Sequence, residues 1–292
     1  MIDLHVHTNY SDGTDDVIDV LKKAEQQKIQ VLSITDHETC EAYNKLKQVD
    51  IKKYFTGKLV PGVELKTKVD GIGIELLGYF VDTDIINVEV KKMYEPLKQG
   101  KDNEPIELCQ ICKKIGIELP EDILKTYDNS KFTYATSHIH NEIIKNKNNR
   151  KFFLYEESWN DSMAFYRKEI ANPASKFYID STKYMPTIQE VINLIRKAGG
   201  LVFVPHIYVY GEHSQKIFEY INQNYKIDGY ECYYSKFTNE NSEFLIDYCK
   251  KHNLLMSGGT DYHGKTKPNI QIGVGKGNLC IPKQLISQWV QI

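Results

Sequence analysis

The amino-acid sequence predicts an α/β fold whose seven strands form a closed or nearly closed barrel. Seven short apolar runs have the length of strands, and they occupy residues 2–7, 31–35, 59–65, 74–80, 201–206, 229–234 and 254–258. Most of the segments between them repeat apolar residues three and four positions apart, as amphipathic helices do. Strands that alternate with helices indicate βα units and a parallel sheet. Seven strands suit a barrel better than an open sheet, although periodicity alone does not separate the two.

The first part of the chain shows this alternation directly. The run IDLHVH (2–7) precedes the helical pattern DDVIDVLKKAEQQ (15–27), which leads to the run VLSIT (31–35). The third and fourth runs, LVPGVEL (59–65) and IELLGYF (74–80), have the length and apolar character of strands. We therefore expect the barrel to begin within the first residues of the chain.

The last part of the chain returns to the same alternation. The pattern TIQEVINLIRKAGG (187–200) predicts a helix, and its two final glycines suit a helix C-terminus. Two further helical patterns, at residues 214–225 and 239–253, alternate with the last three apolar runs. This region is expected to complete the barrel.

The alternation stops between about residues 86 and 185. This stretch is rich in lysine, asparagine and aromatic residues, and it contains helical pieces such as residues 103–116 and 162–170. We interpret residues 86–185 as a mostly helical insertion into a barrel domain formed by residues 1–85 and 186–292. The insertion is expected to cap the site and to decide which substrates fit.

Composition restricts the class of protein. The chain has 292 residues, 41% of them hydrophobic, which is enough for a large buried core, yet no apolar run approaches the roughly 20 residues that span a bilayer. The first residues lack the basic and long apolar regions of a signal peptide. The net charge of −2 indicates no strong nucleic-acid surface, so attraction for an anionic substrate has to be local. We expect a cytoplasmic protein without a membrane partner, and its oligomeric state is left open.

Side chains that can bind metal ions stand at the C-terminal ends of five of the seven runs, the end at which α/β barrels form their active sites. They are His5 and His7 in the first run, His37 after the second, Glu64 in the third, His206 at the tip of the fifth, and Asp261 and His263 after the last. Histidine and carboxylate together suit Zn, Mn or Fe, and this many of them suit more than one ion. One such residue alone is more often a hydrogen-bonded core side chain, but their joint placement predicts a metal site.

Five stretches of the sequence closely resemble the motifs of the polymerase and histidinol phosphatase (PHP) family of metal-dependent phosphoesterases. They are DLHVHTNYSDGT (3–14), ITDHET (34–39), PGVEL (61–65), GGLVFVPH (199–206) and SGGTDYHG (257–264). The resemblance implies a distorted (β/α)7 barrel that holds two or three divalent ions, and it points to the nucleotide-directed branch of the family. The implied ligands are His5, His7, Asp12, His37, Glu64, His206, Asp261 and His263.

The sequence departs from the family pattern at two places. Glu75 stands where the family usually has a histidine, and as a ligand it would favour Mn or Fe somewhat over Zn, or leave one ion weakly bound or absent. In the insertion, ATSHIHNEII (135–144) keeps His138 but lacks the arginine of the Arg-Pro-His triplet of that branch. His138 therefore remains a candidate site residue, while recognition of the substrate phosphate is left open.

Divalent ions at such a site lower the pKa of water to give a hydroxide nucleophile, and they polarise phosphoryl oxygens. The main hypothesis is therefore a phosphatase that hydrolyses a phosphomonoester of a small phosphorylated metabolite or nucleotide. Asp36 or His138 is expected to handle the proton of the leaving group, with Asp36 alternatively orienting its neighbour His37. Lys265 and Arg167, together with His138, are candidates to bind the substrate phosphate.

Four other functions compete with this hypothesis. An exonuclease on short oligonucleotides would be favoured by basic stripes, and histidinol phosphatase is a further possibility within the same family. A metal amidohydrolase would want a bridging lysine on a strand and a lone acid at the last strand, whereas this chain has Asp261 and His263 there. A non-catalytic, metal-stabilised domain would be recognised by eroded ligands, and only Glu75 is altered.

Overall fold

The computed structural model describes residues 1–128, 131 and 134–291. The chain forms two compact units, of which the first comprises Met1–Tyr94 with Pro186–Ile292 and the second comprises Glu95–Met185. Each unit has a hydrophobic core of its own.

The first unit contains all seven predicted strands, which confirms the α/β barrel. They are β1 (Ile2–Val6), β2 (Val31–Ile34), β3 (Lys58–Val69), β4 (Ile72–Tyr79), β5 (Leu201–Val204), β6 (Gly229–Tyr234) and β7 (Leu255–Gly259). They hydrogen-bond in chain order from β1 to β7. Beyond β7, the backbone N–H of Asp261 donates to the carbonyl of His5, and that of His7 donates to the carbonyl of Tyr262. The last strand thereby returns to the first, and the sheet is a distorted, nearly closed barrel.

The direction of β4 differs from the expected parallel sheet. This strand runs antiparallel to both β3 and β5, so the expectation of a wholly parallel sheet was wrong here. Only Asp70 and Gly71 separate β3 from β4, and both have positive φ, at 48° and 76°. A two-residue connection makes a hairpin and cannot form the crossover that parallel strands need. The Asp-Gly pair was the signal for this turn in the sequence.

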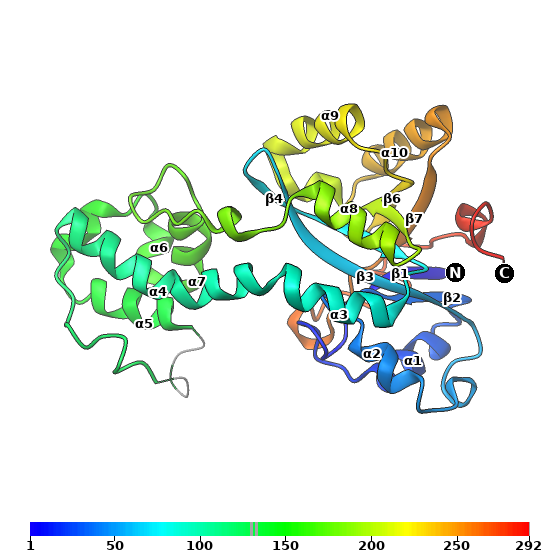
Figure 1. The fold of residues 1–292 in the computed structure, drawn as a ribbon, viewed down its shortest axis with the longest axis horizontal. Helices are drawn as coiled ribbons and strands as arrows, with labels where there is room; N and C mark the ends of the chain where they lie inside the picture. Colours follow the sequence, from blue (N-terminus) through cyan, green and yellow to red (C-terminus); the bar gives the residue numbers. More distant parts are fainter. Residues whose placement is uncertain (129–130, 132–133, 292) are drawn as a thin grey trace. The chain divides into compact units, whose positions relative to one another are not determined.

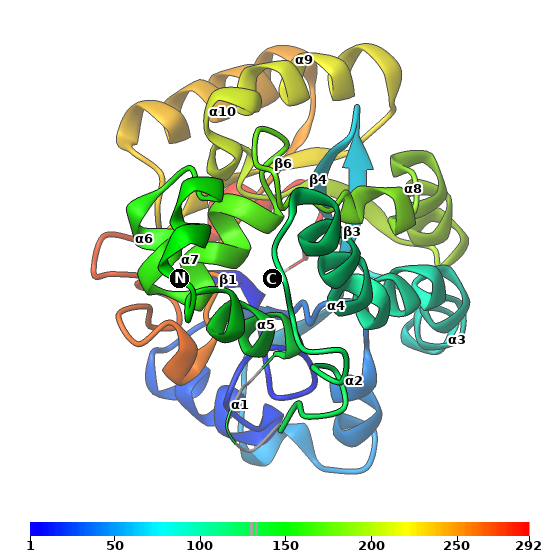
Figure 2. The same ribbon diagram turned by 90° about the vertical axis from the view of Figure 1, so that its left-hand side faces the viewer.

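Helices surround the strands of the first unit (Figures 1 and 2). They are α1 (Val17–Gln26), α2 (Glu41–Leu46), α3 (Thr83–Met93), α8 (Ile188–Lys197), α9 (Ser214–Asn224) and α10 (Asn239–His252). The four helical patterns expected in this unit are confirmed as α1, α8, α9 and α10. Their ends follow local chemistry: the side chain of Asp16 accepts a hydrogen bond at the start of α1, and Thr187 with Glu190 forms a capping box on α8.

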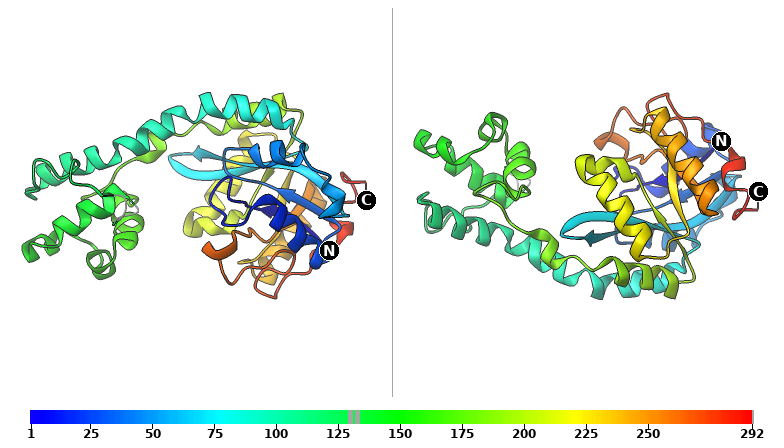
Figure 3. Two further views of the ribbon diagram at one scale, coloured as in Figure 1. Left: turned by 90° about the horizontal axis from the view of Figure 1, so that it is seen from below. Right: turned by 90° about the horizontal axis from the view of Figure 1, so that it is seen from above.

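The core of the barrel includes residues from both ends of the described chain. Ile2 and Leu4 of β1 pack in one buried cluster with Ile281 and Ile286 of the C-terminal segment, which lies beside the start of β1 (Figure 3). Trp289 packs against this cluster, and its indole N–H donates to the carbonyl of Met256 at 3.0 Å. The C-terminal segment therefore covers the end of the barrel at which β1 begins.

The second unit is helical. It contains α4 (Glu95–Ile115), α5 (Ala135–Ile143), α6 (Glu156–Asn160), α7 (Ser162–Phe165) and a π-helical turn, Tyr166–Ile170. Its core is a separate cluster in which Phe153, Phe165 and Phe177 have ring centroids 4.9–5.4 Å apart. Among the described residues, no helix is both long enough and apolar enough to cross a membrane.

The two tryptophans of the chain lie in different units, which makes the cores separately observable. Trp159 packs on Phe153 in the second unit, and Trp289 packs in the first. We expect Phe165→Ala to destabilise the second unit by about 3–5 kcal/mol, because it empties a fully buried aromatic position. Urea unfolding followed by tryptophan fluorescence, in the W159F and W289F backgrounds, measures each unit by itself. The midpoint reported by Trp159 should fall much further than that reported by Trp289, and equal shifts would contradict two separate cores.

Candidate metal centre

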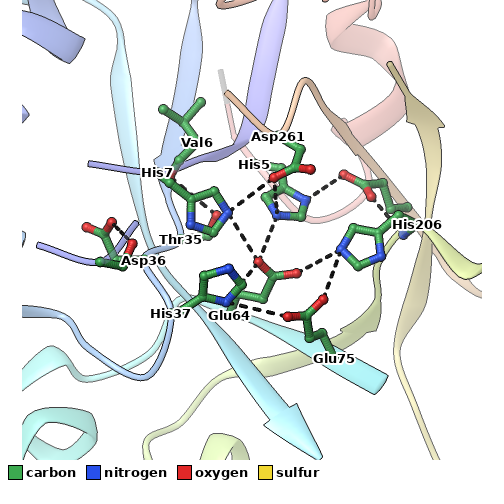
Figure 4. Close-up of polar contacts among 12 residues, drawn as sticks. His5, Val6, His7, Thr35, Asp36, His37, Glu64, Glu75, His206 and Asp261 are labelled. Carbon is green, nitrogen blue, oxygen red and sulfur yellow. Dashed lines mark hydrogen bonds and ion pairs between the residues drawn. The ribbon is translucent and has the colours of Figure 1, made fainter. Parts of the chain in front are cut away.

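The strands and the segments that follow them bring all the expected ligand residues into one cluster. Figure 4 shows His5, His7, His37, Glu64, Glu75, His206 and Asp261. Four overlapping groups have candidate ligand atoms within 4.8 Å of one another: His7 with Asp12, His37 and His263; His5 with His7 and Asp261; His5 with Glu64 and His206; and His37 with Glu64 and Glu75. Their role as metal ligands remains a prediction, but their convergence is a property of the fold.

Glu64 lies at the middle of this cluster. Its Oε2 is 3.1 Å from His5 Nε2 and 3.2 Å from His7 Nε2, and its Oε1 is 2.9 Å from His206 Nε2. His37 Nδ1 is 3.5 Å from Oε2 (Figure 4). Burial would raise the pKa of Glu64, but the charges of His5 and His37 and the hydrogen bonds from His206 and His5 hold it well below the usual range. Glu64 is therefore an ionised carboxylate that can be shared between neighbouring ions.

The Asp12 side of the cluster faces solvent. Asp12 Oδ1 is 3.1 Å from His263 Nε2, and Oδ2 is 3.7 Å from His37 Nε2. The side chain of Asp12 is 58% exposed, whereas His7 behind it is fully buried. Partial burial would raise the pKa of Asp12, but the hydrogen bond from His263 and the nearby histidine charges lower it. A substrate can therefore approach the cluster at Asp12.

Glu75 occupies the position at which the family has a histidine. Its two carboxylate oxygens are each 3.6 Å from a ring nitrogen, Oε1 from His37 Nδ1 and Oε2 from His206 Nε2. Burial and the negative charge of Glu64 raise the pKa of Glu75 to about 7. On β3, Lys66 is its direct register partner. The structure thus places Glu75 in the cluster, at a point where a cation would relieve repulsion between two carboxylates.

The donor atoms fit divalent metal ions. Within the described chain, both ring nitrogens of His7, Nδ1 of His37 and Nδ1 of His206 are buried without a hydrogen-bond partner, which is unusual for buried polar atoms. Burial lowers the pKa of His7, and burial together with the charge of His7 outweighs Glu64 to lower that of His37 to about 4. Neutral imidazole is the form that binds metal, and imidazole with carboxylate is a donor set for Zn, Mn or Fe.

Glu231 of β6 supports the cluster from behind, and the sequence analysis missed it. Its Oε1 lies 3.0 Å from His5 Nδ1, and its Oε2 accepts the backbone N–H of His206 at 2.8 Å. These contacts fix the ring of His5 so that its other nitrogen, Nε2, faces Glu64. The only charged residue in the strand run GYECYY was a signal that could have identified it.

We expect Glu231→Gln to weaken metal binding about 10- to 100-fold, because a carboxylate behind a ligating histidine fixes the ring and strengthens the ligand. The measurement is competition for Mn²⁺ against a chelating dye. Glu243→Gln on the exposed surface of α10 is the matched control and should bind as the unmodified chain does. Equal affinities for the two variants would show that Glu231 does not orient His5.

Asp36 points away from the cluster, toward the loop after β1 (Figure 4). Its Oδ1 accepts the backbone N–H of Thr8 at 2.7 Å and the hydroxyl of Ser11 at 2.6 Å, and its Oδ2 accepts the hydroxyl of Thr8 at 2.7 Å. Asp36 therefore holds the loop that carries Asp12. A direct part for Asp36 in proton transfer stays a prediction, and these contacts favour a positioning role.

Two further candidates belong to the second unit. His138 is in the second unit, where its Nε2 is 3.1 Å from the carbonyl of Ile123 and 3.2 Å from the Thr126 hydroxyl oxygen. Arg167 is exposed on the π-helical turn of the same unit. Their catalytic and substrate-binding roles stay predictions.

A different lysine from the expected one reaches the cluster. Lys265 is exposed, and its backbone N–H donates to the Thr14 hydroxyl. Lys267 places Nζ 2.6 Å from Asp261 Oδ2, the same oxygen that accepts the hydroxyl of Tyr234 at 2.8 Å. The turn Gly264–Thr266 decides which of the two lysines faces the cluster, and sequence spacing did not reveal it.

The backbone at the cluster adopts uncommon conformations. His206 and Asp261 have positive φ, at 26° and 57°, a region that non-glycine residues seldom occupy. Gly259 lets β7 approach β1 closely, since a Cβ atom there would lie 2.2 Å from Cβ of His5. The strained backbone at His206 and Asp261 thus directs both side chains into the cluster.

Comparisons with known proteins show which family the chain resembles. The family model of the PHP domain matches residues 3–195. A 5′–3′ exoribonuclease from Haemophilus influenzae is 26% identical over 294 residues, which cover 98% of this chain and 97% of the relative.

Two solved structures share the fold. A protein assigned as a metal-dependent phosphoesterase from Bifidobacterium adolescentis has a TM-score of 0.63 and 21% identity, over 98% of this chain and 94% of its own. An amidohydrolase from Chromobacterium violaceum has a TM-score of 0.58 and 16% identity, over 93% of this chain and 89% of its own. At these identities the likeness concerns the arrangement of strands and helices alone.

Proposed function

Because the chain belongs to the PHP family of metal-dependent phosphoesterases, we propose that its metal centre hydrolyses phosphoesters of nucleotides, with short RNA degraded from its 5′ end as the first substrate class. The observation that carries the proposal is Glu64, a buried ionised carboxylate within 3.5 Å of four histidines. Such a carboxylate, together with the histidines around it, would hold the divalent ions that phosphoester hydrolysis needs.

The choice of RNA is supported by the relative of matching length, which is named as a 5′–3′ exoribonuclease. The net charge of −2 fits a substrate held at one end rather than along a basic groove. The exposed side chain of Asp12 marks the side of the cluster at which a chain end would enter.

Each residue of the cluster has a proposed role in binding metal or substrate. His5, His7, His37, His206 and His263 would hold the ions with the carboxylates Asp12, Glu64, Glu75 and Asp261. Bound divalent ions supply Lewis acidity, which lowers the pKa of water and polarises phosphoryl oxygens. Glu231 would orient the ring of His5, and Asp36 anchors the loop of Asp12. Lys267 places a positive charge at the rim, where it can meet the phosphate.

A metal amidohydrolase fits the cluster less well. That class wants a bridging lysine, whereas the carboxylate of Glu64 is at the centre of this cluster. The strand lysine Lys66 is instead paired with Glu38, whose Oε2 lies 3.4 Å from its Nζ. The intact set of donors also disfavours a non-catalytic, metal-stabilised domain.

Hydrolysis of a nucleotide phosphomonoester is the second candidate. It is favoured by the same low net charge, because a small substrate needs no basic surface beyond the ions themselves. Histidinol phosphatase is disfavoured by the nucleotide-directed motifs of this chain.

One assay separates these functions. The purified chain with Mn²⁺ is given 5′-phosphorylated oligoribonucleotides, nucleoside mono- and bisphosphates, and amide substrates. We expect nucleoside monophosphates to be released one at a time from the 5′ end of the RNA. Release of inorganic phosphate from nucleotides alone would support the second candidate, and amide hydrolysis without phosphoester hydrolysis would overturn the proposal.

We expect Lys267→Ala to lower kcat/KM for the phosphoester substrate about tenfold or more, because a charge-assisted contact worth roughly 1.5–3 kcal/mol is lost. Lys265→Ala is the matched control, since it removes an equal charge two residues away, and it should retain normal kinetics. Equal losses of kcat/KM in both variants would mean that the overall positive charge of the loop, and not a direct contact from Lys267, assists the reaction.

A further inference from the structure

A pocket inside the second unit is not used by the chemistry described above. It has a volume of about 520 Å³, and its lining includes Lys101, Glu104, Tyr127, Tyr134, Ser137 and Tyr166. This volume lies within the range of about 300–1,000 Å³ that is typical of pockets for small ligands.

Glu104 gives the pocket a buried acceptor. It lies on α4, is 7% exposed, and has both carboxylate oxygens 3.3 Å from the hydroxyl of Tyr166, which donates to them. A carboxylate has about four lone-pair positions, so one phenol leaves further acceptor capacity. Burial raises the pKa of Glu104, while Tyr166 and Lys101 act to lower it. A ligand that donates hydrogen bonds would stabilise the buried carboxylate.

Aromatic rings line the pocket beside this acceptor. Tyr127 packs against His138 with ring centroids 6.2 Å apart, and Nε2 of His138 lies 3.1 Å from the carbonyl of Ile123. This contact anchors the segment that precedes Tyr127. Tyr134, at the start of α5, is 53% exposed. Tyrosine rings are surfaces on which nucleobases stack.

The polar groups of the pocket define which base edge would fit. An ionised carboxylate accepts two hydrogen bonds side by side, and guanine is the common base that presents two adjacent donors, N1–H and N2–H. Adenine and cytosine present a donor beside an acceptor, and uracil presents one N–H between two carbonyls. Next to its two donors guanine carries the acceptor O6, for which Lys101 and the hydroxyl of Ser137 offer donors.

We propose that this pocket binds a guanine base, which stacks on the tyrosine rings and donates N1–H and N2–H to Glu104. The inference deepens the proposed action on nucleotides and rests on it for its biological meaning. It adds a preference for guanine at one position of the substrate.

The probe is guanosine, and its binding to the full chain in EDTA is followed by titration calorimetry. We expect saturable binding, with inosine, which lacks the 2-amino group, and adenosine at least about tenfold weaker. Glu104→Gln should weaken guanosine about tenfold or more, because its amide N–H would face a donor. Glu107→Gln, on the same helix but paired with Lys183 at 3.0 Å, is the matched control and should bind normally.

A second variant keeps the test independent of the buried position. Tyr134→Ala removes an exposed ring and should weaken guanosine about tenfold, since stacking on one aromatic ring contributes this much. Tyr155→Ala, also exposed but outside the pocket, should leave the affinity unchanged. No binding of guanosine, equal binding of inosine, or full affinity in Glu104→Gln would each overturn the guanine site. Guanosine has no phosphate and the assay has no metal, so these outcomes are separate from a failure of phosphoester hydrolysis.

Discussion

Glu64→Gln is expected to lower phosphoester turnover by about a thousandfold, because the loss of several kcal/mol of metal-based transition-state stabilisation has this effect at roughly tenfold per 1.4 kcal/mol. Glu64 approaches His5, His7 and His206 within 3.2 Å, so its charge acts on three of the predicted ligands at once. Glutamine keeps the size of the side chain and removes its charge. The variant should therefore fold and bind less metal.

The measurement is kcat with metal content determined on the same sample. Glu38→Gln is the matched control, because this carboxylate follows His37 in sequence but pairs with Lys66. It should retain metal and most of its turnover. Normal metal content and turnover in Glu64→Gln would contradict the assignment of the whole cluster, whereas loss of activity with full metal content would limit the role of Glu64 to catalysis.

Added Mn²⁺ is expected to raise the Tm of the barrel unit by about 5–10 °C, since a ligand at a hundred times its Kd adds about 2.7 kcal/mol and each kcal/mol corresponds to about 2–4 °C in a unit of this size. The stabilisation by Mn²⁺ is expected because the carboxylates of Glu64 and Glu75 repel each other. The charge of Glu64 helps to raise the pKa of Glu75 to about 7. A cation between them removes this repulsion.

Fluorescence of Trp289 in the W159F background reports the melting of the barrel unit alone. EDTA should reverse the shift, and Glu64→Gln should show a much smaller one. An equal shift in that variant would mean that Mn²⁺ stabilises the unit at another place.

The position of most cluster residues followed from sequence because parallel strands place their carboxyl ends together. His5, His37 and His206 each follow a short apolar run, and the barrel brings these ends to one side. The direction of β4 was missed, although the Asp70–Gly71 pair was readable, because the expectation of βα units was applied to every run. The hairpin, not a crossover, delivers Glu75 to the cluster.

Other features depended on geometry that spacing does not contain. Asp36 and His37 are neighbours in sequence, yet the end of β2 directs one side chain to the Thr8 loop and the other to the cluster. Lys265 was the candidate lysine from the sequence, whereas the turn Gly264–Thr266 leaves Lys267 beside Asp261. Glu231 stood out in sequence as a single charge in an aromatic run. The run alone does not show that this carboxylate contacts His5 and His206.

The barrel core has a consequence for the order in which the two units can fold during synthesis. Ile2 and Leu4 pack with Ile281 and Ile286, so this core is complete only when nearly the whole chain has left the ribosome. The core of Glu95–Met185 is local in the chain and can assemble while β5, β6 and β7 are still being translated. Until then the histidines of β1 are exposed, because the strands that surround them have not yet been made. During that interval the nascent chain is most prone to aggregate or to bind metal ions at these histidines. Ribosome-bound chains halted after residue 230 should therefore show a protected second unit and a protease-sensitive β1.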